Sequence, residues 1–178
     1  MKRRLLSAFL AVMMVLTMAP VAFAADGVEP TDGTGSSEAT PAKTLQKQID
    51  EAKNGATITL NDNYTEDITI PAGKDIILNL NDKTLTNSAG DTITVALGAT
   101  LTIEGKGTVD NVTHGMAAIY NNGTTTLNGG TYTRSLETGD KVTPKNSYYN
   151  ILNHGIMTID KDVTVKQNGN YSSLVANG

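Results

Sequence analysis

The sequence predicts an all-β fold, a right-handed parallel β-helix (solenoid) with a short N-terminal capping helix. Three observations lead to this prediction. After Gly55 no helical periodicity remains, and short runs of alternating apolar and polar residues follow one another, as is typical of strands. These runs return with a period of about 25 residues, which indicates a stacked repeat. A glycine stands at the same place in each period.

The repeat is clearest around five glycines, which are separated by 25, 25, 32 and 23 residues: Gly73, Gly98, Gly123, Gly155 and Gly178. The residue three positions before each of them is apolar or aromatic: Ile70, Val95, Tyr120, Leu152 and Val175. The strand after the turn has two equivalent positions: Ile76 and Leu78, Leu101 and Ile103, Thr125 and Leu127, Met157 and Ile159. A polar turn separates it from a third strand, which opens with threonine and a larger residue: Thr84-Leu85, Thr108-Val109, Thr131-Tyr132 and Thr164-Val165.

One repeat of this size cannot bury its apolar face alone, so it must stack on copies of itself. Each strand then pairs with its equivalent one repeat away, at about 4.8 Å. We expect five apolar side chains to fill the narrow bore: Val95, Leu101, Ile103, Leu127 and Ile159. Thr100 and Thr102 should face outward. A β-sandwich would also show alternation, but it gives no reason for the period.

Glycine and asparagine suit the corners of such a coil, because they adopt left-handed backbone angles at little cost. Asparagines that stack at one corner can also hydrogen-bond to one another. We expect such a ladder between Asn121 or Asn122 and Asn153.

The N-terminus predicts export. Residues 1–24 combine a basic start, an apolar run and small residues before Ala24, which is the layout of a secretory signal peptide. The run is shorter than the roughly 20 residues that cross a bilayer, so we expect cleavage and no membrane span afterwards. Residues 25–43 have the composition of a flexible linker. Thr44 can cap a helix over residues 44–54 that covers the first coil, whose strand edge would otherwise be open.

Charge and composition limit which binding partners and which kind of hydrophobic core this chain can have. Without its three basic signal residues the chain has 11 basic and 18 acidic residues, a net charge of −7. This charge argues against nucleic acid and anionic membranes as partners. The chain has no cysteine, so an exported protein of this sequence depends on its core and not on disulfides. Both phenylalanines precede Ala24 and there is no tryptophan, so the core must be aliphatic and thin.

Several stretches resemble a known family. The cap TLQKQIDEAKNG, the opening ATITLNDNYTEDITI and the repeat IYNNGTTTLNGGTYT resemble secreted bacterial right-handed parallel β-helix repeat (pectate-lyase-like) surface proteins. The resemblance covers residues 44–178 and implies a secreted or cell-surface location. The family holds lyases, hydrolases, adhesins and other surface proteins, so the resemblance is specific for the fold and weak for activity. The sequence ends at SLVANG in the middle of a coil. We therefore expect the β-helix to be truncated there and the isolated fragment to self-associate or fray at that end.

Catalytic residues of the family are not recognisable. A lyase of this fold implies clustered carboxylates for Ca²⁺ and a basic side chain, often arginine, that removes a proton. After the signal there is one arginine, Arg134, and Asp160 and Asp162 only flank a lysine in a turn. A hydrolase implies paired carboxylates with a histidine. Only His114-Gly115 and His154-Gly155 match such motifs. We therefore predict no catalytic residue, no metal site and no cofactor.

The irregular repeat predicts a binding loop. The separation of 32 residues implies about seven extra residues within 134–150. Loops on rigid scaffolds often carry function. The candidate binding residues are Arg134, Glu137, Asp140, Lys141, Tyr148 and Tyr149. We expect an exported non-catalytic β-solenoid, a cell-surface structural, adhesive or carbohydrate-binding module for polysaccharide or a host or cell-wall surface. The alternative is the N-terminal part of a polysaccharide lyase or glycoside hydrolase.

Overall fold

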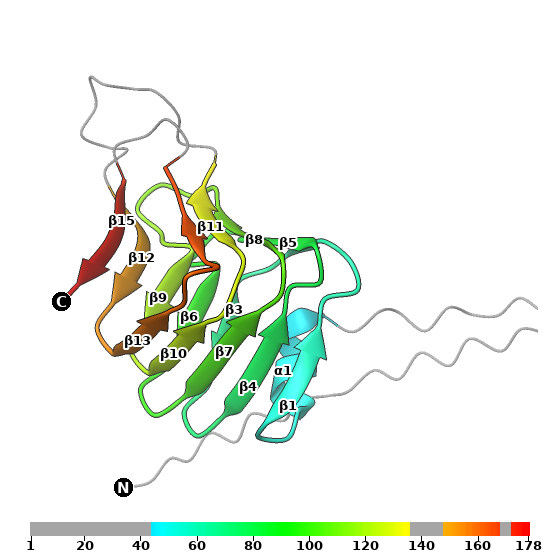
Figure 1. The fold of residues 1–178 in the computed structure, drawn as a ribbon. Coiled ribbons are helices and arrows are strands. Elements are labelled where there is room, and N and C mark those ends of the chain that lie inside the picture. The colour runs from blue at the N-terminus through cyan, green and yellow to red at the C-terminus, as the bar shows by residue number, and fades with distance from the viewer. Residues whose placement is uncertain (1–43, 136–147, 168–171) are drawn as a thin grey trace, which may run out of the picture. The chain divides into compact units, whose positions relative to one another are not determined.

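A computed structural model of the chain describes residues 44–135, 148–167 and 172–178. The predicted signal peptide and linker lie outside these residues. Within them, three all-parallel sheets wind into a β-solenoid with one short helix at its start (Figure 1), as the sequence predicts. No helix among the described residues has the length and apolar character that crossing a membrane requires.

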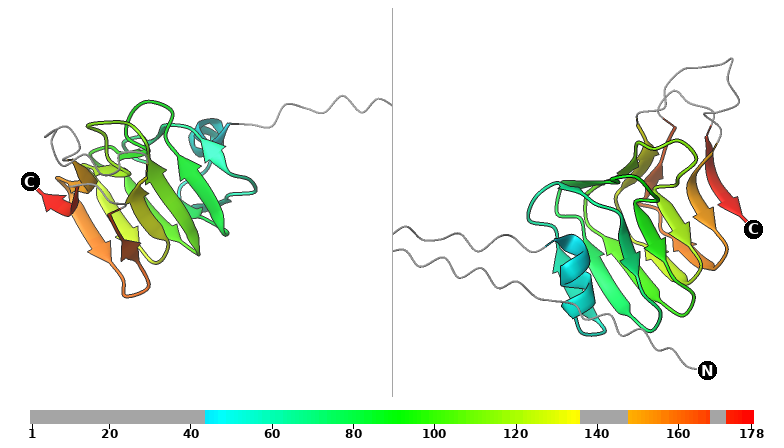
Figure 2. Two further views of the ribbon diagram at one scale, coloured as in Figure 1. Left: turned by 90° about the horizontal axis from the view of Figure 1, so that it is seen from above. Right: turned by 180° about the vertical axis from the view of Figure 1, so that it is seen from behind.

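Each sheet takes one strand from each coil. Sheet A contains β1 (Ala56–Thr59), β4 (Asp75–Asn79), β7 (Thr100–Glu104), β10 (Thr124–Leu127) and β13 (Ile156–Ile159). Sheet B contains β2 (Tyr64–Thr65), β5 (Lys83–Thr86), β8 (Gly107–Asn111), β11 (Thr131–Arg134) and β14 (Thr164–Val165). Sheet C contains β3 (Ile68–Ile70), β6 (Ile93–Val95), β9 (Ile119–Asn121), β12 (Tyr149–Asn153) and β15 (Ser173–Asn177). Figure 2 shows the coils stacked one upon the next.

The register of sheets A and B is the predicted one. In sheet A, Leu127 lies beside Ile103 on one side and Ile159 on the other. In sheet B, Thr131 lies beside Thr108 and Thr164. The inward positions form the core: Leu101, Ile103, Leu127 and Val95 are fully buried. Ile159 occupies the same inward column but is 42% exposed, because its strand has a neighbour on one side only.

The register of sheet C differs from the prediction by one residue. Val95 lies beside Asn121 and not beside Tyr120. Asn121 lies in turn beside Asn153. The alignment at the glycines, which puts Tyr120 and Leu152 at the position of Val95, is therefore wrong for sheet C. The physical reason is that the segment before the glycine is one residue shorter, since one residue, Asn122, lies between Asn121 and Gly123, whereas two, Ala96 and Leu97, lie between Val95 and Gly98. Tyr120 consequently faces outward.

The asparagine ladder forms at this corner. The Asn121 amide donates to Asn153 Oδ1 at 2.6 Å, and the Asn153 amide donates to Asn177 Oδ1 at 3.0 Å. Asn121 Oδ1 also accepts from the Gly123 backbone N–H at 3.1 Å and from the Thr125 hydroxyl at 2.8 Å. From Asn121 onward, the asparagine ladder thus takes the place of the apolar column of sheet C to which Val95 belongs. A Cβ on Gly123 would lie 2.5 Å from the Ala96 and Ala99 carbonyl oxygens, so the tight turn requires glycine.

Helix α1 (Leu45–Glu51) covers the first coil. Its buried residues are Leu45 and Ile49. The Thr44 hydroxyl accepts from Lys47 N at 3.2 Å, the predicted N-cap. The Glu66 carboxylate also accepts from Leu45 N at 3.0 Å and so binds the helix to the first coil. The helix ends at Glu51 and not at residue 54, because Ala52 takes extended backbone angles.

The core predicts the cost of a buried charge. Leu127→Asp would place a carboxylate in the bore among aliphatic side chains, with a loss of more than about 4 kcal/mol in the free energy of unfolding. Thr126→Asp is the matched control, because Thr126 lies on the opposite, outer side of the same strand and is half-buried. Urea unfolding followed by far-ultraviolet circular dichroism measures both. Equal losses for the two variants would contradict the assigned faces of β10.

The ladder predicts a second asymmetry. Asn121→Val introduces the residue type that occupies the equivalent position one coil earlier, Val95. We therefore expect the backbone to accommodate it. The substitution leaves the Gly123 N–H and the Thr125 hydroxyl without their acceptor, at about 1–3 kcal/mol for each buried group. Asn177→Val, at the exposed end of the ladder, should change stability by much less. A stability of Asn121→Val equal to that of the unsubstituted chain would refute a stabilising ladder.

Candidate binding face

The loops that join sheet B to sheet C lie together on one side of the solenoid, and the irregular repeat enlarges one of them. Polar side chains in these loops fix the backbone. The Asp67 carboxylate accepts from Ser88 N at 2.7 Å and from Gly90 N at 2.9 Å. The Asp91 carboxylate accepts from Ala117 N at 2.6 Å in the next coil. Both carboxylates therefore fix the backbone conformation of these loops.

Buried amides complete this support. Asn111 donates to the Gly90 and Ala117 carbonyl oxygens, both at 2.9 Å. Asn150 donates to the Lys166 carbonyl oxygen at 2.6 Å and, more weakly, to that of Tyr132 at 3.4 Å. The bonds from Asn111 to Gly90 and from Asn150 to Lys166 join successive coils, and the other two fix the loop within one coil, so these side chains satisfy buried backbone carbonyl groups at the corner.

Arg134, predicted as part of the binding loop, lies in β11 beneath this corner. It is the last residue of β11 and is fully buried. Its Nη1 donates to the Ser172 hydroxyl at 2.8 Å and its Nη2 to the Thr113 carbonyl oxygen at 3.1 Å. The guanidinium carbon lies 5.6 Å from the centre of the Tyr148 ring. Through this cation–π contact the buried Arg134 helps to hold the Tyr148 ring in place from the interior side.

Asp110 occupies the same region. It lies beside Thr133 of β11 and accepts a hydrogen bond from the Ser135 hydroxyl. Its other oxygen, Oδ1, is buried and accepts no hydrogen bond. Burial raises the pKa of the Asp110 carboxyl above 3.8, while the bonds from Ser135 and the charge of Arg134 act in the opposite direction.

Four aromatic residues are associated with sheet C. We call Tyr148, Tyr149, Tyr120 and His154 the aromatic row. The Tyr148 and Tyr149 rings are 5.1 Å apart and tilted by 46°, and the Tyr120 and His154 rings meet edge to face at 5.7 Å. The three tyrosines are half-buried and His154 is exposed. Partial burial raises the pKa of the Tyr148 hydroxyl, and the charges of Asp91 and Tyr120 raise it further.

The row leads toward a shallow groove at the corner between sheets C and A. Residues of three successive coils line this groove, among them Leu97, Asn122 and His154. Leu97 is 78% exposed and Ile156, also in the groove, is 67% exposed. The Tyr120–His154 pair and the exposed side chains of Leu97 and Ile156 thus gather at this corner.

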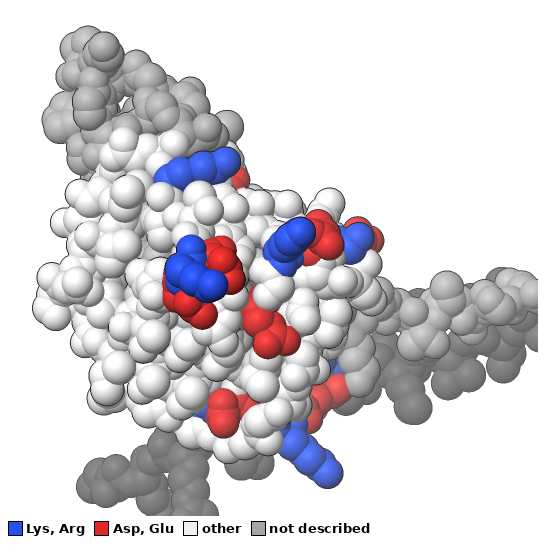
Figure 3. Space-filling model, in the orientation of Figure 1, with Lys and Arg blue, Asp and Glu red and all other residues white. Residues whose placement is uncertain are grey.

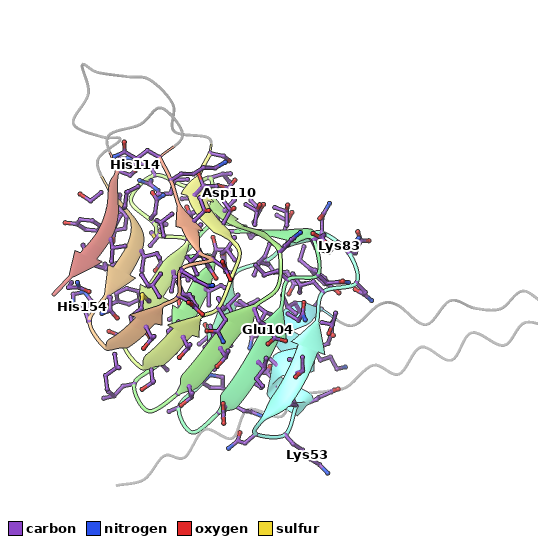
Figure 4. All side chains as sticks on the ribbon, viewed as in Figure 1. Lys53, Lys83, Glu104, Asp110, His114 and His154 are labelled. Atoms are coloured by element: carbon purple, nitrogen blue, oxygen red, sulfur yellow. The ribbon has the colours of Figure 1, made fainter. Side chains whose placement is uncertain are left out.

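Charged side chains are sparse on the face drawn in Figure 3, where both signs are interspersed and most of the surface is uncharged. The two histidines lie apart: Figure 4 shows His114 among the loops and His154 at the other end of sheet C. Among the described residues no three histidine or acidic side chains come together in a group that could hold a metal ion.

The predicted binding residues have different outcomes. Tyr148 and Tyr149 lie together at the start of β12, and Arg134 contacts Tyr148 from the interior. Glu137, Asp140 and Lys141 fall outside the described residues. A binding role for any of the six stays a prediction. Sequence reasoning missed Tyr120 and His154, because alignment at the glycines put Tyr120 at the position of the inward Val95 and His154 was considered only as part of a hydrolase-like His-Gly motif.

Comparison of the chain with family models, with curated proteins and with solved structures found no match in any of the three. The class that the geometry defines is a parallel β-solenoid. Function is therefore inferred from the side chains of this chain.

The raised pKa of Asp110 predicts a pH dependence of stability. The Asp110 carboxyl binds its proton more tightly in the folded protein than in the unfolded chain. Its contribution to the free energy of unfolding is therefore fully present below about pH 3.8 and is lost as the pH rises through the pKa of the folded state. Asp110→Asn is neutral throughout. Its stability relative to the unsubstituted chain should therefore improve between pH 3.5 and pH 7, as measured by urea unfolding. Asp82→Asn, at an exposed corner, is the control. A difference for Asp110→Asn that does not vary with pH would contradict the assignment.

Proposed function

We propose that this protein is an exported, non-catalytic β-solenoid of the pectate-lyase-like type that acts at the cell surface and binds glycans through the aromatic row on sheet C. The signal-like N-terminus supports export. Parallel pairing through every coil supports a rigid scaffold on which surface side chains keep fixed spacings.

The aromatic row is the observation that carries the proposal. Tyrosine offers a large flat apolar face at low entropic cost, together with a hydroxyl that can donate a hydrogen bond. A pyranose ring has an apolar face of similar size, edged by hydroxyls. Tyr120 is presented by the middle of β9, so a strand places it. Sites on regular elements are more precise than sites on loops.

The charge of the protein favours a neutral glycan. The exported chain would carry a net charge of −7, which disfavours polyanions such as polyuronates. Arg134, the one arginine of the mature chain, is fully buried and therefore presents no guanidinium to a carboxylated sugar at the surface. We therefore expect neutral polysaccharide to bind in preference to pectate.

A non-catalytic role agrees with how the acids of the B-to-C corner are used. Asp67 and Asp91 accept backbone hydrogen bonds that fix two loops. A general acid or base must instead reach a substrate proton. The engagement of both carboxylates favours a binding surface over the lyase or hydrolase alternative.

The proposal predicts the effect of removing a ring. Tyr120→Ala and Tyr148→Ala should each weaken binding to the best neutral glycan of a panel by about tenfold, about 1.4 kcal/mol, because each removes a stacking face. The panel contains β-glucan, mannan, xylan and polygalacturonate, and calorimetry measures the affinities.

Tyr120→Phe keeps the ring and should retain most of the affinity. Tyr64→Ala, far away in β2 of the first coil, should retain all of it. Circular dichroism confirms that each variant is folded. Unchanged affinity of both alanine variants, or preferential binding of polygalacturonate, would overturn the proposal.

A further inference from the structure

The turns of the solenoid contain several asparagines that are followed by glycine. Such an asparagine is prone to lose its side-chain amide, because the glycine nitrogen can attack the side-chain carbonyl carbon and no Cβ on the glycine hinders the approach. The described residues contain four Asn-Gly pairs, at 54–55, 122–123, 128–129 and 177–178. A fifth, at 168–169, lies outside them. The structure separates the four described pairs by what holds the glycine N–H.

In three of the four pairs the glycine N–H already has an acceptor. The bonds run from Gly55 N to the Asp75 carbonyl oxygen at 2.8 Å, from Gly123 N to Asn121 Oδ1 at 3.1 Å and from Gly178 N to the Asn153 carbonyl oxygen at 2.9 Å. Attack by one of these nitrogens on the preceding side chain would break its hydrogen bond. The fold therefore protects these three pairs.

The pair Asn128-Gly129, in the turn between β10 and β11, lacks this protection. The Gly129 N–H makes no hydrogen bond to any described residue. Asn128 is exposed, and its side chain likewise makes no hydrogen bond within the described part of the chain. Both reacting groups are therefore available to each other.

This turn is also open to water. Asn128 and Gly129 line a surface hollow at the corner between sheets A and B, together with Lys106 and Asp162. Water is the second reactant of deamidation, and it can also accept the proton that the backbone nitrogen must lose.

We propose that Asn128 is the site at which this folded protein is modified by spontaneous deamidation. The Gly129 nitrogen loses its proton and bonds to Cγ of Asn128, and the bond from Cγ to Nδ2 breaks. The amide nitrogen leaves as ammonia, and a five-membered succinimide ring remains. Water then opens the ring at either carbonyl and gives aspartate or isoaspartate. The net exchange is one amide and one water for one carboxylic acid and one ammonia, without oxidation or reduction.

The two products have different consequences for the corner. Aspartate keeps the main chain and adds one negative charge to the hollow. Isoaspartate lengthens the main chain by one methylene group before Gly129, whose position is tightly fixed. A Cβ on Gly129 would lie 2.8 Å from the Gly105 carbonyl oxygen, and the Gly129 carbonyl oxygen accepts from the buried Tyr132 hydroxyl at 3.0 Å. The isoaspartyl link displaces Gly129 and breaks this hydrogen bond.

The site is tested by incubating the purified full chain at mildly alkaline pH under folding conditions. Digestion in mild acid and mass spectrometry then locate each residue whose amide has become an acid. Asn128 should be modified several-fold faster than Asn122, which has the same glycine neighbour in the same coil. In urea the two rates should converge, because the fold no longer holds the Gly123 N–H. Equal rates in the folded protein, or the same difference in urea, would overturn the proposal.

A single substitution tests the protecting hydrogen bond. Asn121→Val removes the acceptor of the Gly123 N–H and should raise deamidation of Asn122 several-fold, with that of Asn128 unchanged. Asn128→Gln is the matched control and should abolish modification at the 128–129 turn alone. Unchanged deamidation of Asn122 in folded Asn121→Val would refute the role of the glycine N–H.

The products are tested by their stability. Asn128→Asp has the sequence of the aspartate product and should unfold at nearly the same urea concentration as the unsubstituted chain. The isoaspartate form, separated from aged protein by ion exchange, should unfold at a lower one. Equal unfolding midpoints of the two forms would contradict the tight corner at Gly129. Glycan binding by sheet C is independent of these outcomes, because Asn128 lies at the turn from sheet A to sheet B.

Discussion

Parallel pairing of equivalent strands is the constraint on which the rest of the structure depends. At a spacing of about 4.8 Å, every residue lies directly beside its counterpart in the next coil. A position that points inward in one coil must therefore point inward in all of them, and a substitution is always felt by two neighbours. The columns Ile76, Leu101, Thr125, Met157 and Leu78, Ile103, Leu127, Ile159 follow from this constraint.

The same constraint explains where polar residues enter the interior. Where the segment before Gly123 is one residue shorter, the backbone N–H of that glycine donates to Asn121 Oδ1. Stacking then requires a compatible group in the next coil, which Asn153 provides. A buried polar column is stable only when each member is bonded, and the ladder satisfies this through its amides. On the outer side of the same strands, Tyr120 of the aromatic row lies beside Leu152.

The sequence was sufficient for the fold class, the capping helix and the register of two sheets, because alternation and a fixed period are local signals. It misplaced sheet C by one residue, since alignment of the repeats at their glycines put Tyr120 at the position of Val95. The shorter turn is marked in the sequence by the next inward residue, which lies three positions after Gly98 but two positions after Gly123. The site was predicted less well. Tyr148 and Tyr149 were found from the insertion, but the burial of Arg134 arises from packing between β11 and the loops, which no local pattern records. The pairing of Tyr120 with His154 depends on the same register and was missed with it.

The most direct test of the account is the pattern of methyl contacts between strands in solution, measured by nuclear Overhauser effects on the labelled protein. Parallel stacking predicts contacts at a constant sequence separation along each strand pair. Ile76 should contact Leu101 and Leu78 should contact Ile103, both 25 residues apart, and the column should continue from Ile103 to Leu127. Contacts whose separations change by two for each step along a strand would indicate antiparallel pairing, as in a β-sandwich, and would contradict the stacked coil.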